Sequence, residues 1–418
     1  MKISKTAPTR SVRFGLNYVP GKRWYYCWND WNRDEIAADL DAIAALGADH
    51  IRVQLVWPWF QPNPTQVSVC HLERLRELMT LARERDLDVL VCALTGWLSG
   101  YDFLPPNIQR NDVFLSADVM EQSILYFQTL LDTVGDDSNF LGFDLGNEIN
   151  VLSIQLPLEQ GDAWGKKLTD WLRPRMNGRW IVNGIDNLPL YRGSMFSTRH
   201  LAHAYDAFCL HAWPEFTGCL KRGPLDGTPS VHLAAFLTHL CRHFLAREGL
   251  EKPVWVQEFG CSEAWGDAGE REAYLRGSVT HAVAAGATWF TWWCSHDIDR
   301  RYRFNELEYS LGLLTVDNQP KALAKTFRDL VLEFSGRPFI TPPPLSAVLP
   351  GIMPAFEPSI TRALPGSEWV EQNWATTTGE LFERYLQNLP SSVRVCSVLN
   401  WANSKSGRSS VKLETAPH

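Results

Sequence analysis

The chain has 418 residues, more than one ordinary domain needs, and this length suits a barrel enzyme with an appendage. With 45% hydrophobic and 21% charged residues, it can bury a large core, as globular proteins do. The formal net charge of -7 argues against nucleic-acid and membrane partners, which require clustered Lys and Arg, whereas a neutral sugar is compatible with it.

Short β-rich runs alternate with amphipathic helical stretches, a pattern typical of a parallel sheet with crossover helices. The first helical stretch, 34–46, places Ile36, Leu40 and Ile43 on one stripe and stops at Gly47, a common C-terminal signal. Between 183 and 208 the sequence predicts only a marginal helix, at 196–204. The expected strands are 12–17, 50–56, 87–94, 140–146, 180–183, 208–211, 254–257 and 288–293, and the other expected helices are 71–85, 117–133, 162–176, 231–248, 270–285 and 321–334.

Eight strands with nearly as many helices predict an α/β protein with a closed (β/α)8 TIM barrel over residues 1–338. An open doubly wound sheet is the less favoured alternative, because no glycine-rich phosphate loop follows the first strand. The run Ile-Thr-Pro-Pro-Pro at 340–344 indicates a stiff linker. A strand at 345–349, a helix at 368–387 and a strand at 393–399 then predict a small α/β appendage, and residues 339–418 as a whole comprise linker, appendage and polar tail.

The nine cysteines are dispersed without CxxC spacing, and several lie inside apolar runs, as reduced core residues do. The first ten residues hold no apolar run that could serve as the core of a signal peptide. No stretch approaches the roughly 18 apolar residues of a membrane span. We therefore expect a cytoplasmic protein that uses no disulfide, no metal and no cofactor.

Two predicted strands end in a carboxylate, at the end of the barrel where active sites are built. The fourth strand runs into Asn147 and Glu148, and the seventh runs into Gln257 and Glu258. Either glutamate alone could be a solvated loop residue or a helix N-terminal charge. Together, they match the pair that glycoside hydrolysis requires, in which one acid protonates the departing oxygen and one carboxylate attacks the anomeric carbon.

Alternation along the second strand places Arg52 and Gln54 opposite the apolar residues that face the helices, so Arg52 points into the barrel. A buried guanidinium needs a carboxylate partner, and we expect Glu258, with Asp144 as the alternative. A nearby arginine would hold Glu258 ionised, while burial would keep Glu148 protonated.

The motifs Asn147-Glu148 and Gln257-Glu258-Phe259-Gly260 resemble the two signatures of the retaining glycosidase superfamily that includes glycoside hydrolase family five. The resemblance covers about residues 12–335. It implies that Glu148 is the acid/base, that Glu258 is the nucleophile and that Asn147 binds the sugar 2-hydroxyl.

The chain departs from the family at two strand ends. The family usually carries His-x-Tyr after the sixth strand; His211 matches, although a buried structural histidine is the alternative, and Trp213 replaces the tyrosine and cannot donate a phenolic proton. After the third strand, Trp97 stands near the position where many relatives have a histidine, and it could offer an apolar wall. At the eighth strand the family places a tryptophan under the sugar, and between Trp292 and Trp293 we favour Trp293.

Longer strings, among them Trp57–Asn63, Trp292–Arg300 and Glu308–Leu313, resemble the family-five branch of β-mannosidases that act on mannose-β-1,4-N-acetylglucosamine. The resemblance implies a retaining exo-β-mannosidase with a small oligosaccharide as its substrate. Long loops at 95–116 and 294–320 could wall the cleft into the pocket that exo action needs. His296 and Asp297 are then candidates for binding mannose hydroxyls, although they could equally be surface loop charges.

Two rival functions remain at the level of sequence. An endo-acting β-mannanase or β-glucanase would have an open groove, but its polymer substrate lies outside the cell. A catalytically inactive, carbohydrate-binding barrel would have little reason to keep Glu148, Glu258, Asn147 and Arg52 together. Neither metal-ligand spacing nor a dinucleotide loop supports a metal enzyme or an NAD enzyme.

Overall fold

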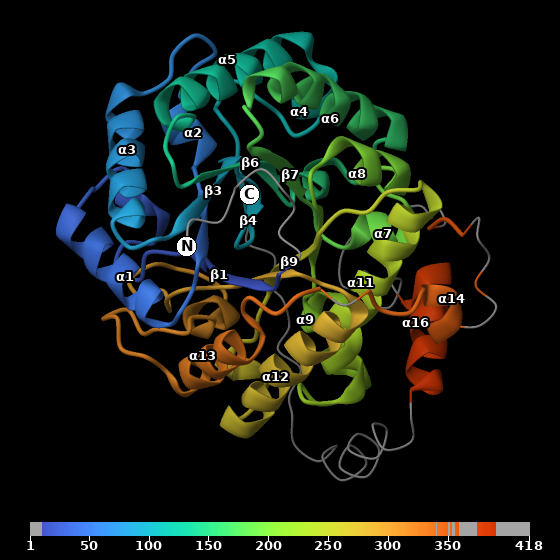
Figure 1. Ribbon diagram of the computed structural model, residues 1–418. Coiled ribbons are helices and arrows are strands. Elements are labelled where there is room, and N and C mark those ends of the chain that lie inside the picture. The colour runs from blue at the N-terminus through green and yellow to red at the C-terminus, as the bar shows by residue number, and fades with distance from the viewer. Residues whose placement is uncertain (1–10, 340, 350–351, 353–355, 359–373, 390–418) are drawn as a thin grey trace.

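The computed structural model describes residues 11–339, 341–349, 352, 356–358 and 374–389. Eight parallel strands form its centre, ringed by helices (Figure 1). The strands are β1 (Arg13–Tyr18), β2 (His50–Gln54), β3 (Asp88–Leu94), β6 (Phe140–Asn147), β7 (Trp180–Gly184), β8 (Phe208–His211), β9 (Val254–Phe259) and β10 (Trp289–Trp292).

The sheet curls round into a barrel. Its strand order is β7-β6-β3-β2-β1-β10-β9-β8, so the first predicted strand pairs with the second on one side and with the last on the other. The two ends of this order meet where the backbone N–H of Asp206, just before β8, donates to the carbonyl of Ile181 on β7 over 2.9 Å. The predicted (β/α)8 barrel is confirmed, and every expected strand lies within two residues of its observed bounds.

The first barrel helix shows how local sequence fixes these elements. Asn32 caps α1 (Arg33–Ala45) because its side chain accepts from the backbone N–H groups of Asp34 and Glu35. The apolar stripe of α1 is buried against the barrel, and the chain leaves the helix through Gly47, whose φ of +82° suits glycine. The other crossover helices are α3 (Val69–Arg83), α5 (Ala117–Val134), α6 (Leu158–Leu172), α8 (Thr198–Ala204), α11 (Thr228–Arg247), α12 (Ala268–Ala285) and α13 (Ala322–Phe334).

Two loops at the C-terminal ends of the strands carry structure that the sequence did not predict. After β3, a small antiparallel hairpin pairs β4 (Gly96–Leu98) with β5 (Tyr101–Phe103). After β10, the long loop contains the 3-10 helix η5 (Glu306–Ser310). Both lie at the end of the barrel where the strand-end carboxylates lie.

The region after the barrel differs from expectation in one element. The predicted strand at 345–349 is wrong: the chain forms a single helical turn, α14 (Leu345–Val348), which starts directly after Pro344 and buries Leu345. The predicted helix at 368–387 is observed from Thr377 onwards, as α16 (Thr377–Asn388), while residues 368–373 and the predicted strand at 393–399 lie outside the described residues. The division of the chain at residue 338 stays a prediction.

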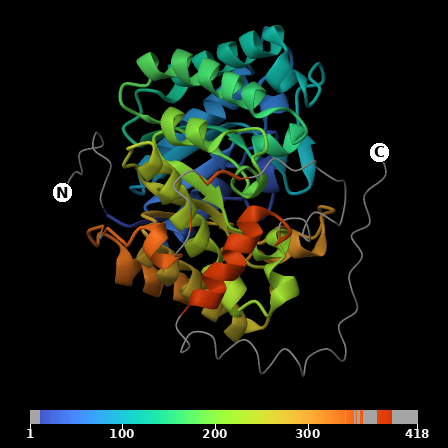
Figure 2. The same ribbon diagram turned by 90° about the vertical axis from the view of Figure 1, so that its right-hand side faces the viewer.

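Helix α16 packs on the flank of the barrel, beside α11 (Figures 1 and 2). The ring of Phe382 stacks on that of Phe236 of α11 at 4.7 Å between centroids. The Thr378 hydroxyl donates to the carbonyl of Leu190 in α7 (Leu188–Arg192) over 2.9 Å. Among the described residues, no helix is both long and apolar enough to cross a membrane.

Candidate active site

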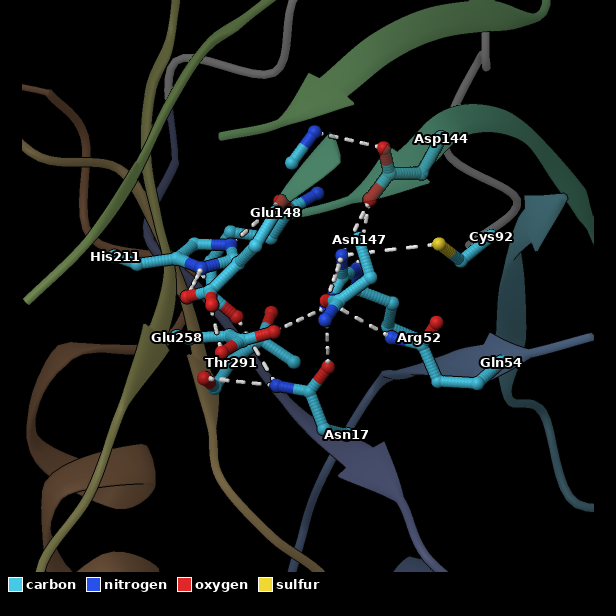
Figure 3. Close-up of polar contacts among 12 residues, drawn as sticks. Asn17, Arg52, Gln54, Cys92, Asp144, Asn147, Glu148, His211, Glu258 and Thr291 are labelled. Atoms are coloured by element: carbon cyan, nitrogen blue, oxygen red, sulfur yellow. Dashed lines mark hydrogen bonds and ion pairs between the residues drawn. The ribbon is translucent and has the colours of Figure 1, made fainter. Parts of the chain in front are cut away.

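Polar side chains from four strands meet around Arg52, which is fully buried on β2 (Figure 3). Its Nε donates to Oδ2 of Asp144 over 2.8 Å, and its Nη1 donates to Oε1 of Glu258 over 2.6 Å. Its Nη2 donates to Oδ1 of Asn147 over 2.8 Å. The guanidinium therefore contacts both carboxylates that the sequence offered as alternatives, and it orients the amide of Asn147 as well.

Glu258 lies near the end of β9 with two further neighbours. The indole Nε1–H of Trp213 donates to its Oε2 over 3.3 Å. Nδ1 of His211 lies 3.3 Å from the same oxygen. The family that this chain resembles usually has a tyrosine at this position. Trp213 has no phenolic hydroxyl, but its indole N–H offers Glu258 a donor there instead.

Glu148 follows β6 in a left-handed conformation, with φ 42° and ψ 37°. Its backbone N–H donates to the carbonyl of Gly184 at the end of β7 over 2.6 Å, which ties the turn to the barrel rim. Its side chain is 16% exposed, and its Oε1 lies 2.8 Å from Nδ1 of His211. Non-glycine residues in this conformation are uncommon and gather at functional sites.

The two glutamates approach each other closely. A carboxylate oxygen of each, together with a ring nitrogen of His211, forms a group whose members all lie within 4.8 Å of one another. Carboxyl groups about 5–5.5 Å apart are typical of retaining glycosidases, whereas inverting enzymes separate them by about 6.5–9.5 Å. The close approach of Glu148 and Glu258 agrees with the retaining arrangement, in which one carboxylate attacks the sugar directly.

Electrostatics distinguishes the two carboxyls. Burial raises the pKa of Glu148 to about 7, and the charge of Arg52 opposes this shift only from a distance. The pKa of Glu258 is raised as well, by burial and by the charge of Glu148, but His211 and Arg52 oppose this rise, the latter through a direct hydrogen bond. The direct bond to a guanidinium favours the ionised form of Glu258 and leaves Glu148 as the better proton donor.

The same three side chains have the ligand types of a metal site. Glu148, His211 and Glu258 could each offer one atom to a cation. Nη1 of Arg52, however, lies 2.6 Å from Oε1 of Glu258, so this carboxylate already forms an ion pair with a fixed positive charge. Repulsion by the guanidinium disfavours a divalent cation here, and the donor set fits acid–base chemistry better.

A cavity opens over these residues at the C-terminal end of the barrel. Its walls include Asn147, Glu148, Glu258, and the three tryptophans Trp97, Trp213 and Trp293. Trp292, in contrast, is fully buried, and its ring packs on Phe259 at 5.1 Å. The cavity therefore combines two carboxylates with wide apolar faces, the chemistry of a sugar site.

A larger cavity lies at the opposite end of the barrel. Its lining includes Arg242, Lys252 and Thr288, beside the points where β9 and β10 begin. Because barrel active sites lie at the C-terminal ends of the strands, we place the chemistry in the smaller cavity.

Two predicted binding residues do not line the smaller cavity. His296 is fully buried, and its Nε2 lies 2.6 Å from Oδ1 of Asn318. Asp297 forms an ion pair with Lys321 over 2.7 Å and accepts from the backbone N–H of Gly312. Both side chains hold the loop after β10 in place, and neither lines the cavity with Glu148 and Glu258.

Two acidic residues at the site escaped the sequence analysis as site candidates. Glu308, in η5, lines the cavity beside the two strand-end glutamates. Asp186, just after β7, is buried and bonded to Asn150. Glu308 belongs to the segment Glu308–Leu313, which resembles the β-mannosidase branch, but it lies in a long loop away from any strand end. Asp186 follows β7 by two residues, and this strand-end position is a signal that could have identified it.

No family model and no curated protein matches the chain, but solved structures do. A variant of the GH5_18 protein from Streptomyces cattleya, in complex with Manβ1-4GlcNAc, is 30% identical with a TM-score of 0.78 and covers 92% of this chain and 93% of its own. The GH5_18 protein from Bifidobacterium longum subsp. infantis is 27% identical with a TM-score of 0.73, covering 78% and 80%. The exo-β-1,4-mannosidase Op5Man5 from Opitutaceae bacterium strain TAV5 is 26% identical with a TM-score of 0.70, covering 81% and 64%.

Proposed function

Because the chain belongs to subfamily 18 of glycoside hydrolase family 5, we propose that it is a retaining exo-β-mannosidase acting on Manβ1-4GlcNAc. The Streptomyces cattleya relative binds this disaccharide, and the Opitutaceae relative is an exo-β-1,4-mannosidase. The substrate is a neutral small oligosaccharide, in agreement with the net charge of -7.

The reaction proceeds by double displacement. Glu258 attacks the anomeric carbon and forms a glycosyl ester, while Glu148 gives its proton to the glycosidic oxygen, which leaves as the GlcNAc hydroxyl. Glu148, now a carboxylate, removes a proton from water, and the water oxygen displaces Glu258 from the anomeric carbon. The observation that carries this proposal is the placement of both carboxylates around Nδ1 of His211.

Exo action is supported by a wall on one side of the cavity, formed by the β4–β5 hairpin and the loop after β10. Ser99 donates to Oε2 of Glu308 over 3.0 Å, and the Tyr101 hydroxyl donates to the carbonyl of Arg303 over 3.2 Å. The ring of Trp24 packs between those of Phe103 and Phe304, at 5.7 Å and 4.9 Å. These contacts join two loops across the intervening strands β1 and β2, so the site has a closed end.

The experiment follows Manβ1-4GlcNAc and mannotetraose by proton NMR with the purified enzyme. We expect β-mannose to appear first from the disaccharide, since retention releases the β-anomer, and we expect little cleavage of the tetraose. The Glu258→Ala variant, with wild-type circular dichroism, serves as the control and should release no sugar. Dominant internal cleavage of the tetraose would instead establish an endo-mannanase, and turnover of β-glucosides alone would establish a β-glucanase.

A cytoplasmic location is also part of the proposal. Eight cysteines fall among the described residues; all eight are free, and seven of them are buried. Burial raises the pKa of the Cys92 thiol well above its usual value, so this side chain stays a protonated, inert thiol. Free thiols in this number suit a reducing compartment, to which the disaccharide would have to be imported.

A further inference from the structure

Glu308 is a third carboxyl group in the wall of the active-site cavity. It lies in η5, is half-buried and lines the same cavity as Glu148 and Glu258. One of its oxygens, Oε2, accepts a hydrogen bond from the Ser99 hydroxyl over 3.0 Å. Within the part of the chain that the structure describes, no residue makes a hydrogen bond or ion pair with the other oxygen, Oε1.

This position is unfavourable for a third carboxylate, because the charges of Glu258 and Glu148 repel a negative charge on Glu308. A tether between the β4–β5 hairpin and η5 needs only an acceptor for Ser99, which a neutral side chain could supply. The carboxyl group therefore does more than hold the two loops together.

We propose that Glu308 binds a hydroxyl group of the glycone sugar through Oε1 and thereby helps the pocket to select its glycone. This inference rests on the proposed function, because it takes the glycone to be the sugar that lies between Glu148, Glu258 and Trp293. Sugar hydroxyls both donate and accept, and the tryptophan faces recognise only the C–H surface of the ring. A carboxyl group fixed by Ser99 adds the directional contact that those faces lack.

The environment of Glu308 agrees with this role. Burial and the charges of Glu258 and Glu148 raise the pKa of Glu308 to about 7, whereas the hydrogen bond from Ser99 opposes the shift. At neutral pH the group is thus present partly as the acid, which can donate as well as accept.

A substrate–enzyme double-mutant cycle tests the contact. Glu308→Ala, Glu308→Gln and Ser99→Ala are compared with the wild type on p-nitrophenyl β-mannoside and on its 3-deoxy, 4-deoxy and 6-deoxy analogues. We expect Glu308→Ala to lower kcat/KM roughly ten- to hundred-fold on the parent substrate, as the loss of a hydrogen bond to a charged group does. On one deoxy analogue this loss should shrink to less than about two-fold, because that substrate lacks the hydroxyl that Glu308 binds.

Ser99→Ala is the matched control, since it removes the tether but keeps the carboxyl group. We expect it to cost less than Glu308→Ala on the parent and to show no preference for one deoxy analogue. If Glu308→Ala does not fold, Glu308→Gln keeps the tether, because its amide oxygen can still accept from Ser99, and it places an N–H donor where Oε1 stands. We then expect a smaller loss on the parent, which again shrinks on the one analogue that lacks the hydroxyl.

Two results would overturn the proposal: an equal loss on the parent and on all three analogues, which means a structural role, or no loss on the parent. Failure of the proposed function looks different, because the wild type itself would then be inactive on the mannoside. In that case the cycle is run on the deoxy series of the β-glycoside that the wild type does cleave, with the same two outcomes.

Discussion

At the scale of single residues, the proton on Glu148 decides the pH range of activity. The acid form is the active one, and burial raises the pKa of this carboxyl to about 7. We therefore expect kcat/KM on Manβ1-4GlcNAc to fall as the pH rises through about 7, since Glu148 then loses the proton that it must donate. The measurement is a pH profile of kcat/KM from pH 4 to pH 9.

The Glu148→Ala variant tests whether Glu148 causes this fall in kcat/KM at alkaline pH, the alkaline limb of the profile. It should be very slow on Manβ1-4GlcNAc, but much less impaired on p-nitrophenyl β-mannoside, whose leaving group needs no protonation. On that substrate azide should restore turnover, and the fall in activity above pH 7 should disappear. A variant that keeps the alkaline fall would show that another group carries the proton.

Asp186 is a second buried acid close to Glu148. Its Oδ1 accepts from the Asn150 amide and from the backbone N–H of Leu188, and its own N–H donates back to Oδ1 of Asn150. Burial and the charge of Glu148 raise its pKa to about 7. The hydrogen bonds between Asp186 and Asn150 thus connect the turn that contains Glu148 with the loop after β7.

We predict that Asp186→Asn moves the alkaline limb of kcat/KM to lower pH. The ionised Asp186 disfavours a negative charge on Glu148, so the neutral amide should lower the pKa of Glu148 by about one unit, the scale on which coupled carboxyls interact. The amide oxygen still accepts from Asn150, which keeps the fold. A limb that stays in place while kcat falls would assign Asp186 a purely structural role.

The alternation of side chains along β2 was enough to predict that Arg52 points into the barrel, because side chains along a strand alternate in direction with a period of two. Irregular loops have no such rule. His296 and Asp297 follow β10 and are candidates for binding sugar from the sequence, but in the structure they contact Asn318 and Lys321. Glu308 reaches the cavity through a contact with Ser99, a residue more than 200 positions away, which no local pattern reveals.

At the scale of elements, a cluster of histidines joins α11, α12 and α16. The rings of His232 and His281 stack at 3.8 Å between centroids, and Nδ1 of His232 lies 3.4 Å from the Tyr385 hydroxyl. Burial and the neighbouring His281 lower the pKa of His232 to about 3, and burial also lowers that of His281. His239, beside Tyr385, has its pKa lowered to about 4 by burial and Arg242.

These shifts predict a loss of stability in mild acid. Each neutral histidine contributes stability that is fully present above the unfolded pKa of about 6.5 and is lost as the pH falls towards the lowered folded pKa. In this window a single histidine lowers the free energy of unfolding by about 1.4 kcal/mol per pH unit. Urea unfolding at pH 7.5 and pH 5 measures the loss.

His232→Gln isolates the effect from that of the carboxylates. The glutamine keeps a polar group near Tyr385 but does not titrate, so the difference between the two pH values should be smaller in this variant. An equal difference in the variant and the wild type would exclude His232 as a source of the acid sensitivity.

Long elements were predictable and short ones were not. The apolar runs of the strands and the stripes of the long helices carry a strong period, so their bounds are close to those observed. The β4–β5 hairpin has only three residues on each side and turns through Gly100, with φ +87°. Its position is fixed by its contact with η5, which no local pattern predicts. The turn α14 was mistaken for a strand because four or five apolar residues have no distinct period.

At the scale of the whole molecule, closure of the barrel brings the chemistry together. Glu148 and Glu258 lie at the C-terminal ends of the fourth and seventh strands, 110 residues apart, and only the curled sheet makes them neighbours. The sequence predicted this because eight alternating units imply closure. It did not predict how α16 joins the barrel, since contacts on an outer flank follow no period of the strands.

We finally predict that α16 is part of the same cooperative unit as the barrel. Phe382 is fully buried, and its ring stacks on Phe236 at 4.7 Å and on Trp374 at 5.2 Å. Phe382→Ala should lower the free energy of unfolding by about 3–5 kcal/mol, the usual cost of a large cavity. Gln387→Ala, at an exposed position of the same helix, should change it by less than about 0.5 kcal/mol.

Urea unfolding followed in parallel by tryptophan fluorescence and by mannoside hydrolysis decides the matter. If both signals shift together in Phe382→Ala, the helix stabilises the active barrel, and the chain does not divide into independent units at residue 338. If activity keeps the wild-type midpoint while part of the fluorescence change moves to lower urea, α16 unfolds separately. The division of the chain into a barrel and an independent appendage would then hold.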